Sequence, residues 1–335
     1  MGLFSSHRGK DLAVINTSAL GGIIEKLSAV NRSLPSIISV SRRTDIPAFY
    51  GEWFERRLCD GFVDVPNPFN RKLRRVSLLH SDVYGYVFWS KNPEPFLPRL
   101  KKLLSKDARV VFHVTLTGLP SNVEQRIPPP DDVIASIVEL SKLLPPGSII
   151  WRFDPMLSPE GHFRKEFRDR FLYLSERLAP FVDRVMVSLL DPMKKTRRNF
   201  PEGDLWWPSG PGGMADHSSR EEIQETLQWM QEETPVSGRV FLCTEPGEAG
   251  IVPSGACISR GDFDRVWGRP KGIPPGSPES APTRPGCGCD RSIDIGVYDT
   301  CPGGCRYCYA VASHEKVLSR WEGHDSSAPS LGSFL

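Results

Sequence analysis

The sequence lacks an excess of charge of either sign, and it lacks a long apolar run. Its 42 Lys and Arg residues nearly balance 40 Asp and Glu residues, which leaves a net charge of +2. This balance gives no electrostatic basis for a nucleic-acid or membrane partner, so we expect neither. No apolar stretch reaches about 18 residues, and the start MGLFSSHRGKDL has no apolar signal-peptide segment. We therefore expect a cytoplasmic protein that acts on a small-molecule substrate.

Cysteine is almost missing from the first 240 residues, where Cys59 stands alone on a predicted helix face and is expected to belong to the core. The other seven of the eight cysteines lie in the last hundred residues, at Cys243, Cys257, Cys287, Cys289, Cys301, Cys305 and Cys308. Because cytoplasmic thiols are kept reduced, these residues are better interpreted as metal ligands or reactive groups than as disulfides.

A glycine-rich dinucleotide fingerprint is also missing after the first apolar run, which weakens a Rossmann interpretation. Instead, short β-branched runs alternate with amphipathic segments. The predicted strands are 37–40, 83–89, 109–115, 148–153, 184–189, 239–243 and 292–298. The predicted helices are 49–58, 96–104, 131–144, 165–178, 220–232 and 310–321. About seven such units predict an α/β fold whose parallel sheet forms a barrel or partial barrel.

The domain organisation follows from the same alternation. We expect one domain over residues 36–321, preceded by an N-terminal extension at 1–35 and followed by a frayed tail at 322–335.

Polar side chains follow most of the predicted strands, at the end where barrel enzymes carry their chemistry. A capping or turn role would explain any one of them equally well, but their convergence on one face favours a cofactor site. The candidates for cofactor binding are Ser41, Arg42, Arg43, Thr44, Asp45, Lys91, Arg152 and Asp154.

The strongest pattern is SIDIGVYDTCPGGCRYCYA, which spaces Cys301, Cys305 and Cys308 at i, i+4 and i+7. Three thiolates on such a loop can each hold one iron of a 4Fe–4S cluster and leave the fourth iron open. S-adenosylmethionine (SAM) can chelate the open iron, and one electron can then cleave a C–S bond of its sulfonium. Tyr307, beside the last thiolate, is expected to pack near the adenine.

This spacing resembles the radical SAM superfamily, whose cluster motif is CxxxCxxC after the first barrel strand. The resemblance implies two cofactors, a 4Fe–4S cluster and SAM, and an external one-electron reductant such as flavodoxin or ferredoxin. The family motif normally lies near the N-terminus, whereas here it is almost at the end. A circularly permuted barrel reconciles the two, with 292–298 as the first strand and 37–40 beside it as the second. Residues 41–45 then occupy the place where the family holds the methionine end of SAM, although its usual glycine-rich sequence is absent.

Residues 36–310 as a whole resemble a bacterial family of unknown function, through SRRTDIPAFY, NPFN, VFWSKNP, VTLTG, WRFDP and the cysteine-rich ending. Relatives in that family include a noncanonical radical SAM enzyme of arsinothricin biosynthesis. This resemblance implies a transferase that moves the 3-amino-3-carboxypropyl group of SAM to a small soft acceptor such as arsenite.

The remaining thiols allow several interpretations. Soft thiolates suit a thiophilic ion, so Cys287 and Cys289 could present the acceptor as catalytic residues beside the cluster. Together with Cys243 and Cys257 they could equally bind an auxiliary iron–sulfur cluster or a structural zinc. Buried apolar cysteines are the plainest alternative.

Two other functions remain open at this point. A zinc-stabilised binding protein would use the same cysteines, and metal content separates it from an iron–sulfur enzyme. A lesion lyase, or another enzyme that forms 5′-deoxyadenosine from SAM, would share the cluster but act on a different substrate. Analysis of the products distinguishes them, because methylthioadenosine signals release of the aminocarboxypropyl group.

Overall fold

The computed structural model describes residues 34–157, 165–190, 193–200, 220–243, 252–273, 281 and 286–331. The chain divides into residues Met1–Leu34 and a compact unit, Pro35–Leu335, which contains all the elements below. No helix among the described residues is long and apolar enough to cross a membrane.

A seven-stranded sheet forms the centre of this unit, and all its neighbouring strands are parallel. Its strands are β1 (Ser36–Val40), β4 (Val83–Ser90), β5 (Val110–Thr115), β6 (Ile149–Met156), β7 (Val185–Leu189), β8 (Val240–Leu242) and β9 (Ser292–Asp294). Each matches one of the seven predicted strands, so the prediction of an α/β fold with a parallel sheet is confirmed.

The strand order is β8-β7-β6-β5-β4-β1-β9, so the last strand of the chain lies beside the first. Ile37 pairs with Ser292, and Ser39 pairs with Asp294. This register confirms the prediction that segment 292–298 pairs with 37–40, although β9 ends at Asp294. In the described part of the chain, β8 and β9 each have one neighbouring strand, so the sheet is open there rather than closed into a barrel.

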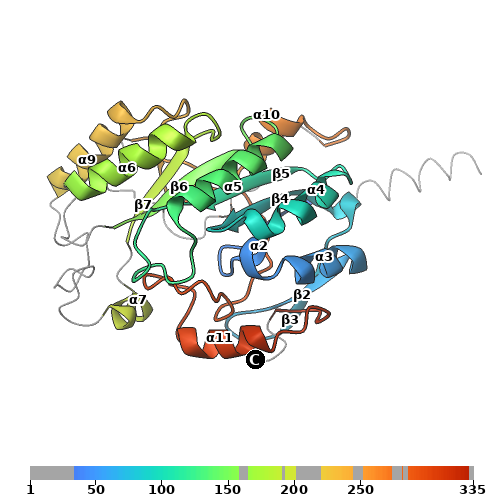
Figure 1. The fold of residues 1–335 in the computed structure, drawn as a ribbon. Helices are drawn as coiled ribbons and strands as arrows, with labels where there is room; N and C mark the ends of the chain where they lie inside the picture. The colour runs from blue at the N-terminus through green and yellow to red at the C-terminus, as the bar shows by residue number, and fades with distance from the viewer. Residues whose placement is uncertain are drawn as a thin grey trace, which may run out of the picture. The chain divides into compact units, whose positions relative to one another are not determined.

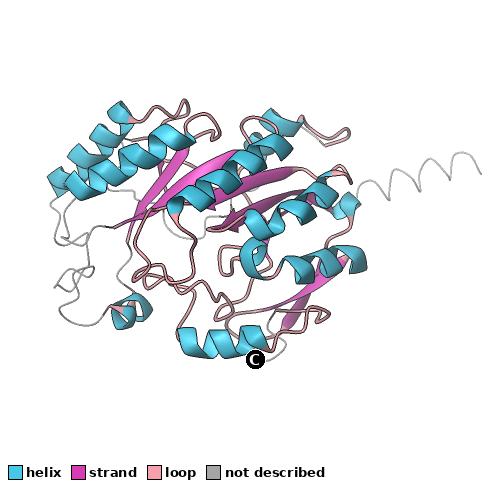
Figure 2. Ribbon diagram, viewed as in Figure 1, coloured by secondary structure: helices cyan, strands magenta, loops and turns pink. Residues whose placement is uncertain are grey.

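Helices cover one face of the sheet, as Figures 1 and 2 show for α4 (Leu97–Leu104), α5 (Pro130–Leu143) and α6 (Lys165–Leu178). These three, with α3 (Gly51–Asp60), α9 (Arg220–Glu233) and α11 (His314–Glu322), match predicted helices. The others are α2 (Ile46–Phe49), α7 (Lys194–Asn199) and α10 (Arg260–Trp267), with short 3-10 turns at His80–Asp82 and Glu94–Phe96. A hairpin of β2 (Phe62–Pro66) and β3 (Leu73–Ser77) was not expected.

The two faces of the sheet have separate cores. Under the helices, aromatic side chains such as Phe112 and Trp151 are fully buried. On the opposite face, here called the inner face, Val111, Ile150 and Met186 pack with Phe263 of α10 and with several cysteines. Gly85 of β4 makes room for the Phe263 ring, because a Cβ there would lie 2.3 Å from it.

The C-terminal segment after α11 packs against α3. Trp53 donates its indole N–H to the carbonyl of Ala328 at 2.8 Å, and Arg57 donates to the carbonyl of Ser327 at 2.8 Å. Leu331 is fully buried. Where the sequence predicts a frayed tail from residue 322, the structure has a docked segment, because backbone carbonyls here supply acceptors that no side-chain pattern reveals.

Candidate functional site

The segment that follows β9 is tied to β1 through one carboxylate. Asp294 accepts hydrogen bonds from the hydroxyls of Ser39 and Ser41, at 2.8 and 2.6 Å, and from the backbone N–H groups of Arg42 and Gly296, at 2.9 and 3.0 Å. Arg42 adds an ion pair at 3.7 Å. Asp294 therefore fixes the start of the segment that leads to Cys301, Cys305 and Cys308.

The residues predicted to bind a cofactor after β1 mostly hold this segment in place. Thr44 donates to the carbonyl of Val297 at 2.9 Å and also contacts the Thr300 hydroxyl. Arg43 donates to the carbonyl of Gly296 at 3.3 Å and lies 5.0 Å over the Tyr298 ring. The partners of Ser41, Arg43 and Thr44 thus lie in residues 294–300, which lead into the CxxxCxxC motif.

Asp45 has a dual position at the end of the same stretch. Its carboxylate caps α2 by accepting the N–H of Ala48 at 3.0 Å, and it accepts the N–H of Lys91 at 2.8 Å. Burial raises the pKa of Asp45 to about 6, in spite of those hydrogen bonds. The carboxylate therefore joins the loops after β1 and β4 at the carboxyl edge of the sheet.

The three cysteines of the CxxxCxxC motif form the cluster loop, residues 301–308. Burial, together with the nearby Cys308 thiolate, raises the pKa of Cys301 to about 12. Burial also raises the pKa of Cys308 and that of Cys305. Three half-buried thiols whose pKa values are raised in this way hold their protons at neutral pH unless a positive charge joins them, as a bound metal does.

Backbone N–H groups act on two of these thiols. The N–H groups of Asp45 and Gly303 lower the pKa of Cys301, and those of Ala310 and Val311 lower the pKa of Cys308, against the larger effect of burial. Such donors stabilise a thiolate and are a feature of iron–sulfur ligation. The residues present therefore fit a group that takes up the three sulfurs as thiolates.

The backbone of the cluster loop is braced against the segment after β5. Cys305 and Glu124 form an antiparallel bridge, and Arg306 donates its N–H to the carbonyl of Val123 at 3.0 Å. Gly304 adopts a φ of +73°, which a side chain rarely tolerates. Gly304 thus lets the cluster loop turn tightly at this point.

No three His, Cys, Asp or Glu side chains among the described residues converge as ligands of a single metal ion. The three cysteines of the cluster loop are spread along the loop instead. Ligands of a 4Fe–4S cluster each bind a different iron, so they do not need to converge on one point.

A buried charged network lies beside Cys305. Lys91 and Glu124 form an ion pair at 2.7 Å, and Glu124 also accepts from the hydroxyls of Thr117, at 2.7 Å, and Tyr307. The Lys91 ammonium lies 5.5 Å from the centre of the Tyr307 ring. Sequence reasoning had identified Lys91 and Tyr307 but missed Glu124, which lies in a loop with no motif to mark it.

A second charged pair stands on β6. Arg152 is paired with Asp154, which also accepts a hydrogen bond from the Ser188 hydroxyl of β7. The guanidinium lies 5.3 Å over the ring of Trp89, which stacks on His113 at 4.2 Å. These groups come from the carboxyl-terminal halves of neighbouring strands, the end at which parallel α/β folds bind their ligands.

The four other late cysteines also come together. The sulfurs of Cys243 and Cys257 lie 3.2 Å apart, Cys289 belongs to the same packed cluster, and Cys287 packs against that cluster. They lie on the inner face, away from the helix-covered core. The sequence interpretation grouped these residues correctly but could not show which of them touch.

Other candidates have simpler outcomes. Cys59 is exposed on α3, so the prediction that it belongs to the core is wrong.

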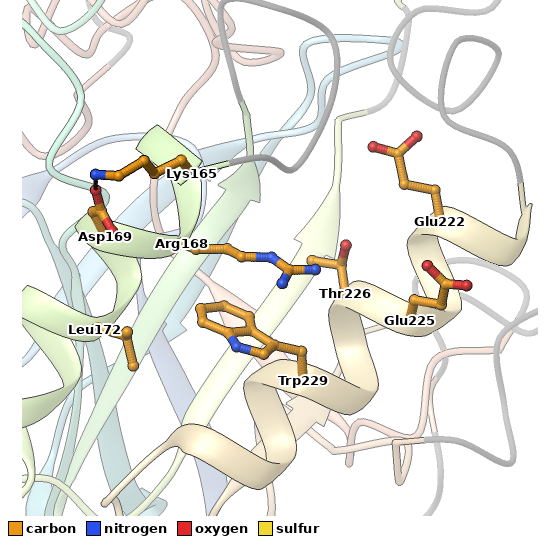
Figure 3. A pocket seen from close by; sticks show the side chains of 8 residues that line it. All are labelled: Lys165, Arg168, Asp169, Leu172, Glu222, Glu225, Thr226 and Trp229. Atoms are coloured by element: carbon orange, nitrogen blue, oxygen red, sulfur yellow. Dashed lines mark hydrogen bonds and ion pairs between the residues drawn. The ribbon is translucent and has the colours of Figure 1, made fainter.

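A groove of about 500 Å³ lies between α6 and α9, where Arg168 faces Trp229 (Figure 3). None of the predicted site residues lines that groove. Polar residues 191, 244 and 245, at the ends of two strands, lie outside the described residues.

Comparison with known proteins gives one positive result. No curated protein matches the chain. Residues 37–310 match the family described as a domain of unknown function, DUF1848. The match covers well over half of the 335 residues and includes both the cluster loop and the network around Glu124. The chain therefore belongs to the DUF1848 family.

Proposed function

We propose that this protein is a radical SAM enzyme whose 4Fe–4S cluster is held by Cys301, Cys305 and Cys308. The observation that carries the proposal is the cluster loop, in which three half-buried thiols lie on one short segment that is braced against the loop after β5. When bound, the cluster would supply the electron that cleaves a C–S bond of SAM.

The chain's own residues have separate tasks in this proposal. The three thiols lose their protons and hold the cluster, while Asp294 and Thr44 fix the loop that carries them. An open barrel built from the parallel sheet, circularly permuted so that β9 takes the first position, agrees with the pairing of β9 and β1.

SAM brings an amino group and a carboxylate, so its site needs a carboxylate and a cation of its own. Lys91 with Glu124, and Arg152 with Asp154, are buried pairs of opposite charge at the carboxyl edge of β4, β5 and β6. Each pair is neutral as a whole. When SAM binds, a charged residue of the pair can leave its partner and form an ion pair with the oppositely charged group of the ligand instead. We propose that these residues and Tyr307 orient SAM.

The specific reaction that we propose is transfer of the 3-amino-3-carboxypropyl group of SAM to a small soft acceptor such as arsenite. It is supported by the resemblance described above and by the thiols gathered on the inner face. An external reductant such as flavodoxin or ferredoxin would supply the electron.

Anaerobic reconstitution with iron and sulfide tests the proposal. We expect about four irons and four sulfides per chain and a brown colour. Replacing Cys301, Cys305 or Cys308 by Ala should remove both, whereas Cys59→Ala, a change to the exposed cysteine, should have no effect. Retention of the same iron content in the triple Ala variant would disprove the assignment.

Incubation of the reduced protein with SAM then identifies the reaction. Methylthioadenosine, formed faster when arsenite is present, is the expected product. Formation of 5′-deoxyadenosine alone would leave a radical SAM enzyme but refute the aminocarboxypropyl transfer.

A further inference from the structure

The hairpin of β2 and β3 carries exposed apolar side chains at its tip. Phe69, in the turn between the two strands, is 94% exposed, and Leu73 at the start of β3 is 64% exposed. A single exposed apolar side chain is common on protein surfaces and needs no explanation by itself. Here, however, the backbone around Phe69 is held in a way that keeps the ring in solvent.

The turn is fixed by its own hydrogen bonds. The Asn67 side chain accepts the N–H groups of Phe69 and Asn70, at 2.9 and 3.2 Å, and the Asn70 side chain accepts the N–H of Lys72 at 3.0 Å. Backbone hydrogen bonds of 2.9 Å join Asn67 to Lys72 and to Arg71. Because the turn is ordered before any contact is made, little conformational freedom is lost when a partner covers the Phe69 ring.

The hairpin is also fixed at its base. Asp64 of β2 donates its N–H to the carbonyl of Pro329 at 2.9 Å, and its carboxylate pairs with Arg75 of β3 through two hydrogen bonds of 2.9 Å. Val63 and Val76 are buried in the core under the helices. The tip is therefore carried on a rigid support.

Positive charge gathers on the same hairpin. Residues 62–77 contain four Arg or Lys and one Asp, a net charge of +3, although the whole chain has a net charge of only +2. Arg71, Lys72 and Arg74 are exposed, while Arg75 is paired with Asp64. A surface that complements this tip should offer apolar side chains bordered by carboxylates.

The groove between α6 and α9 has both properties. Leu172 and Trp229 supply apolar surface, and Glu222 and Glu225 stand on the α9 side (Figure 3). The groove, of about 500 Å³, has room for an aromatic side chain. Helix α9 as a whole contains five Glu and one Arg, a net charge of −4.

The groove also holds two cations, which come from α6. Lys165 pairs with Asp169 at 2.6 Å, and Arg168 lies over the Trp229 ring at 4.9 Å. The pair is neutral as a whole, which leaves Arg168 against Glu222 and Glu225. The lining of the groove is therefore net negative, opposite in sign to the hairpin.

We propose that the tip of the β2–β3 hairpin docks in the α6–α9 groove of a second copy of the chain. Phe69 would pack against Leu172 and Trp229, and the exposed cations beside it would face the carboxylates of α9. The hairpin and α9 lie far apart within the unit formed by residues 35–335 (Figure 1), so the tip does not reach the groove of its own chain. This contact depends neither on the cluster nor on SAM.

Such a contact is heterologous, because it joins two different surfaces of the same chain. Copies joined in this way form head-to-tail chains or, if the rotation between them closes, rings. One hairpin tip in one groove is a small interface, of the kind found in transient association. Association should therefore rise with protein concentration and weaken as salt screens the charged groups.

Sedimentation velocity of the full-length chain, over a range of protein and salt concentrations, measures the association. A reductant is present throughout, since the exposed Cys59 could otherwise link two copies by a disulfide. Phe69→Ala should weaken association at least ~10-fold, as loss of a buried aromatic anchor does. Lys72→Glu should also weaken it, whereas the same charge change at an exposed position of α4, Lys101→Glu, should leave it unchanged.

Mixing two variants tests which surfaces meet. Phe69→Ala keeps the groove, and the double variant Glu222→Lys, Glu225→Lys keeps the tip, so each should be monomeric alone. When mixed, they should form a one-to-one pair that grows no further, because only one working tip and one working groove are present. Circular dichroism checks that each variant is folded.

Several outcomes would overturn the proposal. They are an unsubstituted chain that stays monomeric at every concentration, association that Phe69→Ala does not weaken, and mixed variants that fail to pair, which would mean that the tip meets another surface. A labelled single-stranded oligonucleotide tests a different occupant. If the monomer binds it and Phe69→Ala abolishes that binding, the hairpin serves nucleic acid instead of a second copy.

Discussion

Replacing Asp294 by Asn should loosen the anchor of the cluster loop. Each carboxylate oxygen accepts one serine hydroxyl and one backbone N–H, from Ser41 and Gly296 on one side and from Ser39 and Arg42 on the other. In the Asn variant an amide NH₂ replaces one of the two oxygens. That NH₂ group is itself a donor, and it would face two donors, a serine hydroxyl and a backbone N–H, where an acceptor is needed. The backbone N–H cannot reverse, so its hydrogen bond is lost.

The serine hydroxyls cannot easily adapt either. Ser39 already accepts from the Trp89 indole at 3.0 Å, and Ser41 accepts from the N–H of Arg43 at 3.0 Å. Because a hydrogen bond to a charged acceptor contributes about 1.5–3 kcal/mol, we expect Asp294→Asn to lower the free energy of unfolding by about 3 kcal/mol.

Urea unfolding followed by fluorescence measures the change, which should shift the midpoint and leave the slope unaltered. Iron bound after reconstitution should fall in parallel, because Asp294 positions the cluster loop. Asp325→Asn is the matched control: its exposed carboxylate accepts from the N–H and hydroxyl of Ser327, at 2.8 and 2.7 Å, and water can replace those bonds. A loss below about 0.5 kcal/mol in Asp294→Asn, the range of ordinary surface changes, would refute the anchoring role.

Three further changes test the fold. Burial, with Arg152 nearby, holds the pKa of His113 well below 6.5. The unfolded chain therefore takes up a proton first, and the free energy of unfolding falls as the pH drops below about 6.5. His113→Gln should reduce that dependence by up to about 1.4 kcal/mol per pH unit, measured by urea unfolding from pH 7 to 5. Gly85→Ala should cost about 1–3 kcal/mol because the new methyl meets the Phe263 ring, and an unchanged melting temperature would contradict this packing. Removing residues 323–335 should expose Trp53 to water, seen as a red shift of its fluorescence, and no shift would mean that the docked segment does not shield it.

Local patterns predicted the sheet because its strands are continuous β-branched and apolar runs, which a parallel sheet covered on both faces requires. The hairpin of β2 and β3 gave no such signal. Its strands are short and mix charged with apolar residues in no regular pattern. They are joined by Asp64 and Arg75, paired at 2.9 Å through both oxygens. Helix α10 was missed because its contact with the sheet combines one buried ring, Phe263, with polar contacts that no apolar pattern marks. Asp262 pairs with Arg184 at 2.7 Å, and Trp267 donates its indole N–H to the carbonyl of Val110 at 2.9 Å.

The candidate site was predicted where residue spacing alone carries the chemistry, as in Cys301, Cys305 and Cys308. Glu124 could not be found that way. Its importance comes from contacts with Lys91 and with Tyr307, which is 183 residues away in the chain, and nothing in its neighbours in sequence marks it. Ser41 and Thr44 were found, but their side chains turn out to bind Asp294 and the carbonyl of Val297, which lie before the cluster loop.

The position of β9 at the edge of the sheet also sets an order of events during synthesis. β1 and β4 through β8 all leave the ribosome before β9, so the free edge of β1 stays open until residues 292–294 arrive. Domains fold as their elements emerge, and an unpaired strand edge is prone to associate with other chains. The thiols of the cluster loop follow immediately after that strand, so a chain interrupted anywhere before Cys301 has both an unprotected edge and no means to take up iron through these three cysteines. Pairing of the last strand of the sheet and completion of the cluster loop thus coincide once residues 292–308 have been made.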